Sequence, residues 1–115
     1  QTDSMEKANA QLKDLYQSLR EYLTDLGDDV QERVLKLYIA FKRIKNFATV
    51  KLQTHNNCLL IWLPLNPDEF ALEEGFSRDV RGIGHHGTGD LELTIRNLDD
   101  LEKAKPLIQK SFEES

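Results

Sequence analysis

The chain has 115 residues, of which 39% are hydrophobic and 30% charged, a balance that fits one globular domain and excludes a disordered chain. Its longest apolar run, residues 58–63, is much shorter than the ~20 residues that span a bilayer, and no secretory signal stands at the start. The only cysteine, Cys58, lies in that run and cannot form an internal disulfide, so we expect a buried structural thiol, with a reactive nucleophile as the alternative. These features predict a cytoplasmic protein without a membrane partner. Because the chain opens with Gln1 and has its only methionine at Met5, further sequence on its N-terminal side is expected.

The N-terminal part of the chain predicts one long helix. We expect residues 1–4 to be disordered and residues 5–27 to be helical, with Asp3 or Ser4 as the N-cap and Gly27 at the C′ position. Apolar residues recur there at spacings of three and four: Leu12, Leu15, Tyr16, Leu19, Tyr22, Leu23 and Leu26. This spacing is typical of an amphipathic helix that packs on a sheet.

Residues 30–65 are expected to form strands. The segment 30–41 fits a helical period and a strand alternation equally well, but the β-forming side chains of Tyr38, Ile39 and Phe41 favour a strand over about Leu37–Lys42. Residues 47–53 alternate as a half-buried strand, and residues 58–65 are apolar on both faces, as in a central strand. Asn56 and Asn57 between them indicate a turn, so we predict a hairpin or meander.

The C-terminal part adds a connection, a strand and a helix. Residues 66–90 read as a connection that contains a glycine loop, with Ser77 capping a short turn over residues 78–80. Residues 91–96 alternate strictly, which predicts a one-sided edge or outer strand with its polar residues outward. Residues 98–114 predict a helix.

This last helix has candidate caps and one awkward residue. Asn97 or Asp99 would cap it, with Glu102 completing a capping box after Asp99. Pro106 predicts either a kink or a short first turn followed by a new helix. The predicted fold is thus α+β in a single domain over residues 1–115: a long N-terminal helix, an antiparallel sheet of about four to five strands, and a C-terminal helix packed on the sheet.

The stretch 81–90 is the richest motif of the chain, with four of its six glycines and two of its three histidines. A tight turn or bulge explains the glycines, and a cradle of backbone N–H groups for an anion is the alternative. The candidate ligand-binding residues are Arg78, Arg81, Gly84, His85, Gly87, Thr88 and Gly89. The stretch lacks the Gly-Lys-Ser/Thr of a P-loop, and it leads into a strand, unlike a dinucleotide-binding fingerprint.

The same stretch offers little chemistry. His85 and His86 are adjacent and would point to opposite faces of a strand, and no cysteine pair completes a ligand set with them and Asp90. The serines and Cys58 stand in no recognisable nucleophile motif. We therefore expect no metal, no cofactor and no enzymatic activity.

Charge is distributed unevenly along the chain, whose net charge is −5. Residues 33–67 contain no Asp or Glu and six basic residues, which indicates either a solvated strand surface or a face for a polyanion or an acidic partner. The nucleic-acid candidates are Lys42, Arg43, Lys45 and Lys51. Phe47 among them would stack a base only if it were exposed, and a position in the core is the stronger expectation. A pI near 5.2 argues against strong non-specific binding.

Several short motifs resemble an uncharacterised prokaryotic domain labelled "predicted transport protein". They are Tyr38-Ile39-Ala40-Phe41-Lys42 with Asn46-Phe47, Ser77-Arg78-Asp79-Val80, Gly84-His85-His86-Gly87-Thr88-Gly89-Asp90-Leu91-Glu92, and Leu107-Ile108-Gln109-Lys110-Ser111-Phe112. The resemblance runs over roughly residues 12–114, and the chain departs from it at His86, where that family usually has Trp or Tyr. The element order is also similar to the small helix–sheet–helix domains of the MmcQ/YjbR kind.

The resemblance implies a functional setting. That domain occurs alone or C-terminal to restriction-type or repair-type nuclease modules, so the expected partners are nuclease or other domains of a parent protein, with DNA as a further candidate. Our first hypothesis is a non-catalytic accessory or recognition domain of a larger nuclease or defence-related protein. The alternatives are a nucleic-acid-binding module that uses the basic residues 42–51, and a phosphate or small-ligand site at the glycine loop.

Overall fold

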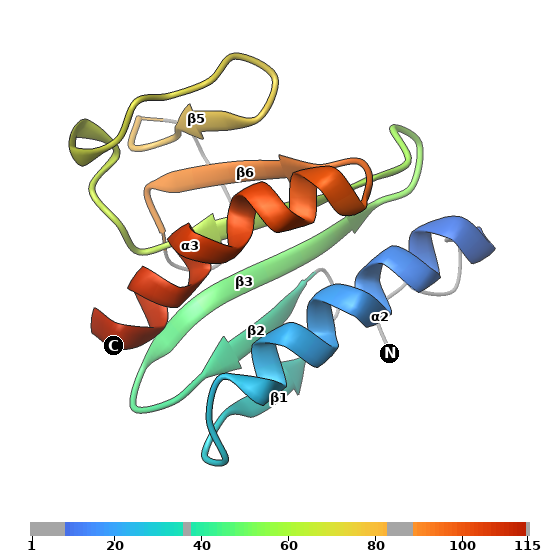
Figure 1. Ribbon diagram of the computed structural model, residues 1–115, viewed down its shortest axis with the longest axis horizontal. Coiled ribbons are helices and arrows are strands. Elements are labelled where there is room, and N and C mark those ends of the chain that lie inside the picture. The colour runs from blue at the N-terminus through green and yellow to red at the C-terminus, as the bar shows by residue number, and fades with distance from the viewer. Residues whose placement is uncertain (1–8, 36–37, 83–88, 115) are drawn as a thin grey trace.

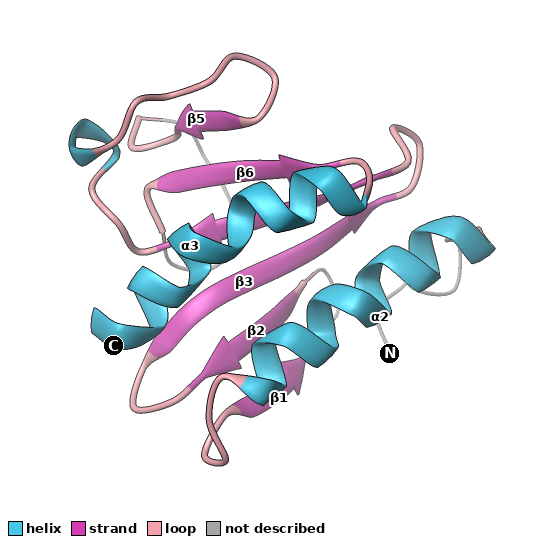
Figure 2. Cartoon of the chain, viewed as in Figure 1, coloured by secondary structure: helices cyan, strands magenta, loops and turns pink. Residues whose placement is uncertain are grey.

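The computed structural model describes residues 9–35, 38–82 and 89–114, and over these ranges the chain is an α+β fold of two α-helices and six strands (Figures 1 and 2). In chain order the elements are α2 (Ala10–Asp25), β1 (Gln31–Val34), β2 (Ile39–Lys42), β3 (Asn46–Gln53), β4 (Cys58–Leu63), the 3₁₀ turn η1 (Pro67–Glu69), β5 (Ser77–Asp79), β6 (Leu91–Ile95) and α3 (Leu98–Glu114). The α+β prediction is confirmed, but the sheet has six strands instead of four to five.

The strands form one antiparallel sheet in the order β1-β2-β3-β4-β6-β5. The first four strands follow one another as a meander. The chain then crosses to β5 at the far edge and returns with β6, which lies between β4 and β5. Helices α2 and α3 lie on the same face of the sheet (Figure 1), and they bury the side chains of that face in the main core.

Helix α2 buries the predicted apolar stripe, of which Leu12, Leu19 and Leu23 have at most 2% exposure. Its N-cap is Asn9, whose Oδ1 accepts a hydrogen bond from the N–H of Leu12 at 2.8 Å. The prediction of Asp3 or Ser4 as the cap is therefore wrong for this helix, and the predicted start at residue 5 lies outside the described residues. The helix ends at Asp25, two residues before Gly27.

The two edge strands differ from the prediction: β1 lies within the predicted strand region 30–65 but was not expected as a separate strand, and β5 was expected to be a turn. β1 is a four-residue polar strand that Glu32 ties to α2, since its carboxylate accepts hydrogen bonds from the Tyr16 hydroxyl at 2.9 Å and from Arg20 Nε at 2.8 Å. Of the turn predicted over residues 78–80, Arg78 and Asp79 instead belong to β5. The strand predicted over Leu37–Lys42 is β2, which begins at Ile39.

The presence of β5 changes the position of β6. Leu91, Leu93 and Ile95 face the core as predicted, but β6 is an inner strand, not an edge or outer one. Its alternate residue Glu92 is therefore only 7% exposed, although the sequence pattern suggested an outward polar residue.

Helix α3 is one continuous element that contains Pro106, so the predicted division into a short turn and a second helix is wrong. Asn97 caps it as predicted, with its Oδ1 accepting from the N–H of Asp100 at 2.8 Å. Pro106 is exposed, while Ala104 and Ile108 on either side are buried. Packing on the sheet thus offsets the backbone hydrogen bond that the proline removes.

Candidate functional site

The predicted ligand residues of the glycine stretch are only partly described. Gly84, His85, Gly87 and Thr88 lie outside the described residues. Gly89 has a φ of +145°, and a Cβ on it would lie 2.9 Å from backbone atoms of Leu63. At this position a glycine is required because the backbone passes close to β4, which agrees with the structural interpretation of the motif.

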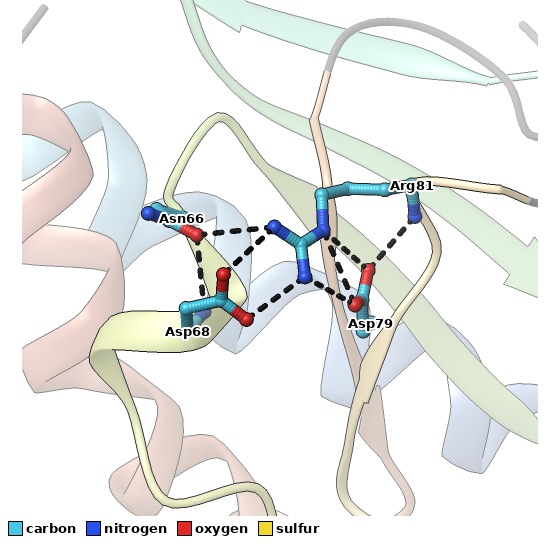
Figure 3. Close-up of polar contacts among 4 residues, drawn as sticks. All are labelled: Asn66, Asp68, Asp79 and Arg81. Atoms are coloured by element: carbon cyan, nitrogen blue, oxygen red, sulfur yellow. Dashed lines mark hydrogen bonds and ion pairs between the residues drawn. The ribbon is translucent and has the colours of Figure 1, made fainter.

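Arg81, the second predicted donor, is held by two carboxylates (Figure 3). Its Nη2 contacts Asp79 Oδ2 at 2.7 Å and Asp68 Oδ1 at 2.9 Å, its Nη1 contacts Asp68 Oδ2 at 3.1 Å, and its Nε contacts Asp79 Oδ1 at 3.1 Å. These hydrogen bonds, first from Asp79 and then from Asp68, raise the pKa of Arg81, and they lower the pKa of both carboxyl groups. All three nitrogens of the guanidinium already donate to carboxylates, so Arg81 joins η1 to β5 instead of offering donors to a ligand.

The register of the strands places a different set of residues together, on the side of the sheet away from α2 and α3. We call this side the second face. Directly opposed residues of an antiparallel sheet share a face, and one row of such residues crosses all six strands: Arg33, Ala40, Thr49, Trp62, Glu92 and Arg78.

The row is accessible mainly at its ends. Arg33 and Arg78 are exposed, whereas Thr49 and Trp62 have 0% and 3% exposure. The middle of the second face therefore offers no surface on which a ligand could stack.

Glu92 accepts hydrogen bonds from both of its neighbours in the row, Trp62 and Arg78. Trp62 Nε1 donates to Glu92 Oε2 at 3.0 Å, and Arg78 Nη2 lies 3.1 Å from Oε1 and 3.2 Å from Oε2. The side chain of Glu92 is 9% exposed and that of Arg78 is 58% exposed. A buried carboxylate thus fixes one end of an accessible guanidinium, a charge-assisted contact that links β4, β6 and β5.

A groove of about 580 Å³ lies next to this contact. Its lining includes two pairs of residues that oppose each other across neighbouring strands, first Arg78 with Glu92 and then Leu60 with Thr94. Arg96, two residues after Thr94, also lines the groove. Nη1 of Arg96 donates to the carbonyl oxygen of Gly75 at 2.6 Å. The groove therefore has an arginine on each side of Thr94.

Cys58 also lines the groove but is 2% exposed. Its thiol donates to Gln53 Oε1 at 3.3 Å. Burial raises its pKa, an effect that the nearby charge of Arg96 partly offsets. A thiol with a raised pKa forms little thiolate, so the structure favours the predicted buried thiol over a nucleophile.

The predicted nucleic-acid residues do not form one surface. Arg43 is directed toward the helix layer, where it contacts Asp29 Oδ2 at 3.2 Å and lies 4.9 Å from the centre of the Phe112 ring. Lys42 and Lys45 are exposed around the β2–β3 turn, while Lys51 lies on the second face opposite Leu60.

Phe47 is fully buried, as predicted. It meets Phe112 edge to face at 5.2 Å, and a register shift between β2 and β3 occurs at this point. Phe47 is therefore not accessible for stacking on a base.

Of the groove residues, only Arg78 was a predicted site residue. The sequence prediction does not include Glu92, Trp62, Thr94 and Arg96 as site residues, because it contains no strand at β5 and gives β6 a solvated outer face. The available signal was the Trp62 side chain, a polar-tipped aromatic in an otherwise apolar strand, which needs a hydrogen-bond acceptor when it is buried.

Residues 9–35, 38–82 and 89–114 lack a metal-binding cluster and a membrane-spanning helix. This part of the chain contains no group of three or more His, Cys, Asp and Glu side chains placed to hold a metal ion. It likewise contains no helix with the length and apolar character needed to cross a bilayer.

Comparison with known proteins places the chain in a family. It is 32% identical over 103 residues to a protein of Haemophilus influenzae described as "Uncharacterized protein"; the match covers 90% of this chain and 33% of that relative, so the chain spans about a third of the relative's length. No solved structure matches the chain. The model of the family described as "Domain of unknown function (DUF5655)" matches residues 1–115 in full. The chain therefore belongs to the DUF5655 family.

Proposed function

We propose that this chain is a non-catalytic recognition domain whose ligand or partner binds in the groove on the second face. The main support is the state of the Arg78 guanidinium. Its Nη2 contacts Glu92, while Nε and Nη1 of Arg78 make no hydrogen bond to the described part of the protein. A positioned charged group with unused donors is typical of a binding site.

Two other hollows support this proposal less well. The hollow beside Gly89 contains Arg81, whose donors are used by Asp68 and Asp79. The hollow between the N-terminal halves of α2 and α3 is lined by apolar, polar and charged residues, among them Leu15, Leu98, Asp14 and Asp99, and it shares Arg96 with the groove. Among its described lining residues, no buried charged group positions another side chain.

A screen of small fragments followed by ¹⁵N NMR would test the proposed site. We expect the fragments that bind to shift the amide signals of Cys58, Leu60 and Thr94 more than those near Arg81 or Leu98. Fragments that bind only beside Arg81, only between the helices, or nowhere would contradict the proposal.

We further propose that the domain works within a larger nuclease or defence-related protein. The support is the resemblance given above and the greater length of the Haemophilus influenzae relative. In this setting the chain would recognise a ligand or a neighbouring domain while another module performs the chemistry. Cleavage of DNA by the chain alone with a divalent metal, lost in Glu92→Gln or His85→Ala, would contradict a non-catalytic role.

A nucleic-acid-binding module is the second candidate. The observation in its favour is that Lys42 and Lys45 are exposed near one another at the β2–β3 turn, beside the exposed Ile44. Reversing both charges with Lys42→Glu and Lys45→Glu should abolish binding of a DNA duplex, and the affinity of the unchanged protein should fall steeply with salt. Absence of binding at low salt would rule out this candidate.

A further inference from the structure

We infer that the groove on the second face binds a small molecule through an oxoanion, a phosphate or a carboxylate, which is held between Arg78 and Arg96. This inference rests on the proposed function and specifies the chemistry of its ligand. Three features of the groove carry it: the charge balance, the placement of the two arginines, and the unused donors on each of them.

The charge balance of the groove favours an anion. Its described lining contains two arginines and one carboxylate, that of Glu92. Glu92 is nearly buried and already accepts from Trp62 and Arg78, so its negative charge is paired with one of the two arginines. One positive charge in the groove is therefore left uncompensated.

The two arginines lie at different positions along the direction of β6. Arg78 opposes Glu92, and Arg96 follows four residues after Glu92, which corresponds to about 14 Å between the Cα atoms of Glu92 and Arg96 at ~3.4 Å per residue. Thr94 lies midway on the same face and lines the groove. The hydroxyl of Thr94 adds a neutral donor between two charged ones, as suits an oxoanion with several acceptor oxygens.

Each guanidinium is anchored by one nitrogen and leaves the others available. Arg78 is anchored by Nη2 on Glu92, and Arg96 by Nη1 on the Gly75 carbonyl. Within the described residues no hydrogen bond occupies their remaining nitrogens. An arginine held in this way loses less side-chain freedom on binding, and its planar donor pair matches phosphate or carboxylate oxygens.

The groove size fits a small molecule. A volume of about 580 Å³ lies within the range of roughly 300–1,000 Å³ that is usual for small-molecule sites. Apolar surface from Leu60 lies beside the charged groups and can contact the rest of the ligand.

The protein contains its own reporter for this binding. Trp62 is the only tryptophan, and its Nε1 shares the Glu92 carboxylate with Arg78. A ligand that draws Arg78 toward itself changes the hydrogen bonding of the indole, so it should alter tryptophan fluorescence.

The test is a fluorescence titration at low ionic strength with three probes of similar ring size and different head groups: phenyl phosphate, benzoate and benzyl alcohol. Inorganic phosphate is a fourth probe, and a short single-stranded oligonucleotide is a fifth. We expect saturable binding of phenyl phosphate, benzoate or both, and none of benzyl alcohol. The anion that binds with the higher affinity shows whether the groove prefers a phosphate or a carboxylate. The affinity for inorganic phosphate shows how much the head group alone contributes to binding.

The variants locate the site. Arg96→Gln and Arg78→Gln should each weaken binding by about tenfold, as expected for loss of one charge-assisted donor group. Arg96→Gln is the safer variant because it leaves the buried Glu92 contact intact. Arg33→Gln is the matched control: it is an exposed arginine on the same face, about 24 Å away across five strand spacings of ~4.8 Å, and it should bind like the unchanged protein.

The outcomes separate this inference from the proposed function. Equal affinity in Arg96→Gln and Arg33→Gln, or no binding of any anion at high millimolar concentration, overturns the oxoanion inference. Binding of benzyl alcohol in the groove without binding of the anions also overturns it, but leaves the groove as the site of recognition. Much tighter binding of the oligonucleotide than of phenyl phosphate overturns the small-molecule part and points to nucleic acid.

Discussion

Arg78 and Glu92 face each other across β5 and β6, with Arg78 Nη2 at 3.1 Å from Glu92 Oε1. The carboxylate is nearly buried and the guanidinium is mostly exposed. This asymmetry means that Glu92 acts as an anchor inside the protein while Arg78 keeps part of its donor set at the surface. The pair is the structural basis of the proposed recognition groove.

Replacement of the anchor should weaken both the fold and the groove. In Glu92→Gln the charge of Arg78 loses its partner, but the amide oxygen can still accept from Trp62. Because Arg78 is more than half exposed and solvent screens its charge, we expect a loss of only about 1–2 kcal/mol in the free energy of unfolding, measured with urea. Glu74→Gln, at an exposed position, is the control. Equal stability of the two variants would show that Glu92 is not an anchor.

Alanine substitutions at Gly89 and Gly82 test whether the close backbone approach at Gly89 requires a glycine. Gly89→Ala places a Cβ 2.9 Å from the backbone of Leu63 at a φ of +145°, so it should cost about 2 kcal/mol or more of unfolding free energy. Gly82→Ala meets nothing within 4 Å and has no positive φ, so it should be neutral or slightly stabilising. Thermal unfolding of the two variants checks the difference, and similar midpoints would contradict the assignment of Gly89.

Tyr16 should give the protein a pH dependence at alkaline pH. Burial, and then the hydrogen bond to Glu32, raise the pKa of Tyr16 above its ordinary value of 10.0. Since the unfolded chain ionises near that value and the folded protein does so only at higher pH, the stabilisation is complete below pH 10 and declines as the pH rises above it.

The measurement is the free energy of unfolding between pH 8 and about 11, in the unchanged protein and in Tyr16→Phe. The decline above pH 10 should be smaller in Tyr16→Phe, because the group responsible for part of it is absent. Tyr22→Phe is a useful comparison, since the pKa of Tyr22 is also raised by burial but is lowered in part by Lys105. Parallel curves for the unchanged protein and Tyr16→Phe would contradict this role of Tyr16.

Arg81 should matter for the connection between η1 and β5 but not for anion binding. In Arg81→Gln the carboxyl groups of Asp68 and Asp79 lose the hydrogen bonds that lower their pKa. The stability difference from the unchanged protein should be present above the ordinary carboxyl pKa near ~4 and should shrink as the pH falls below it. The affinity for phenyl phosphate should stay unchanged, and a large loss of affinity would place the site at Arg81 instead of at the groove.

The elements with strong periodicity could be predicted from the sequence, and the edge strands could not. The stripe of α2 and the alternation of Leu91, Leu93 and Ile95 are long enough to specify both the element and its buried side. β1 and β5 have only four and three residues and are largely polar, so their strand state depends on the neighbours with which they pair. Asn9 was missed as a cap because the first helix was expected to begin earlier.

The candidate site depended on one of these missed strands. Arg78 was selected from the sequence, but its partner Glu92 could not be, because the pairing of β5 with β6 joins residues 14 positions apart. Arg81 was selected for the same reason as Arg78, its position near the glycines. Asp68, 13 residues away, occupies it in the folded chain. The local sequence does not distinguish an arginine that is saturated by carboxylates from one that keeps free donors.

The measurement that tests the recognition groove most directly is NMR of the arginine Nε–H groups during titration with phenyl phosphate. We expect the signals of Arg78 and Arg96 to shift and saturate together, while those of Arg33 and Arg81 stay in place. Shifts confined to Arg81, or equal small shifts of all four signals, would contradict a binding site between Arg78 and Arg96.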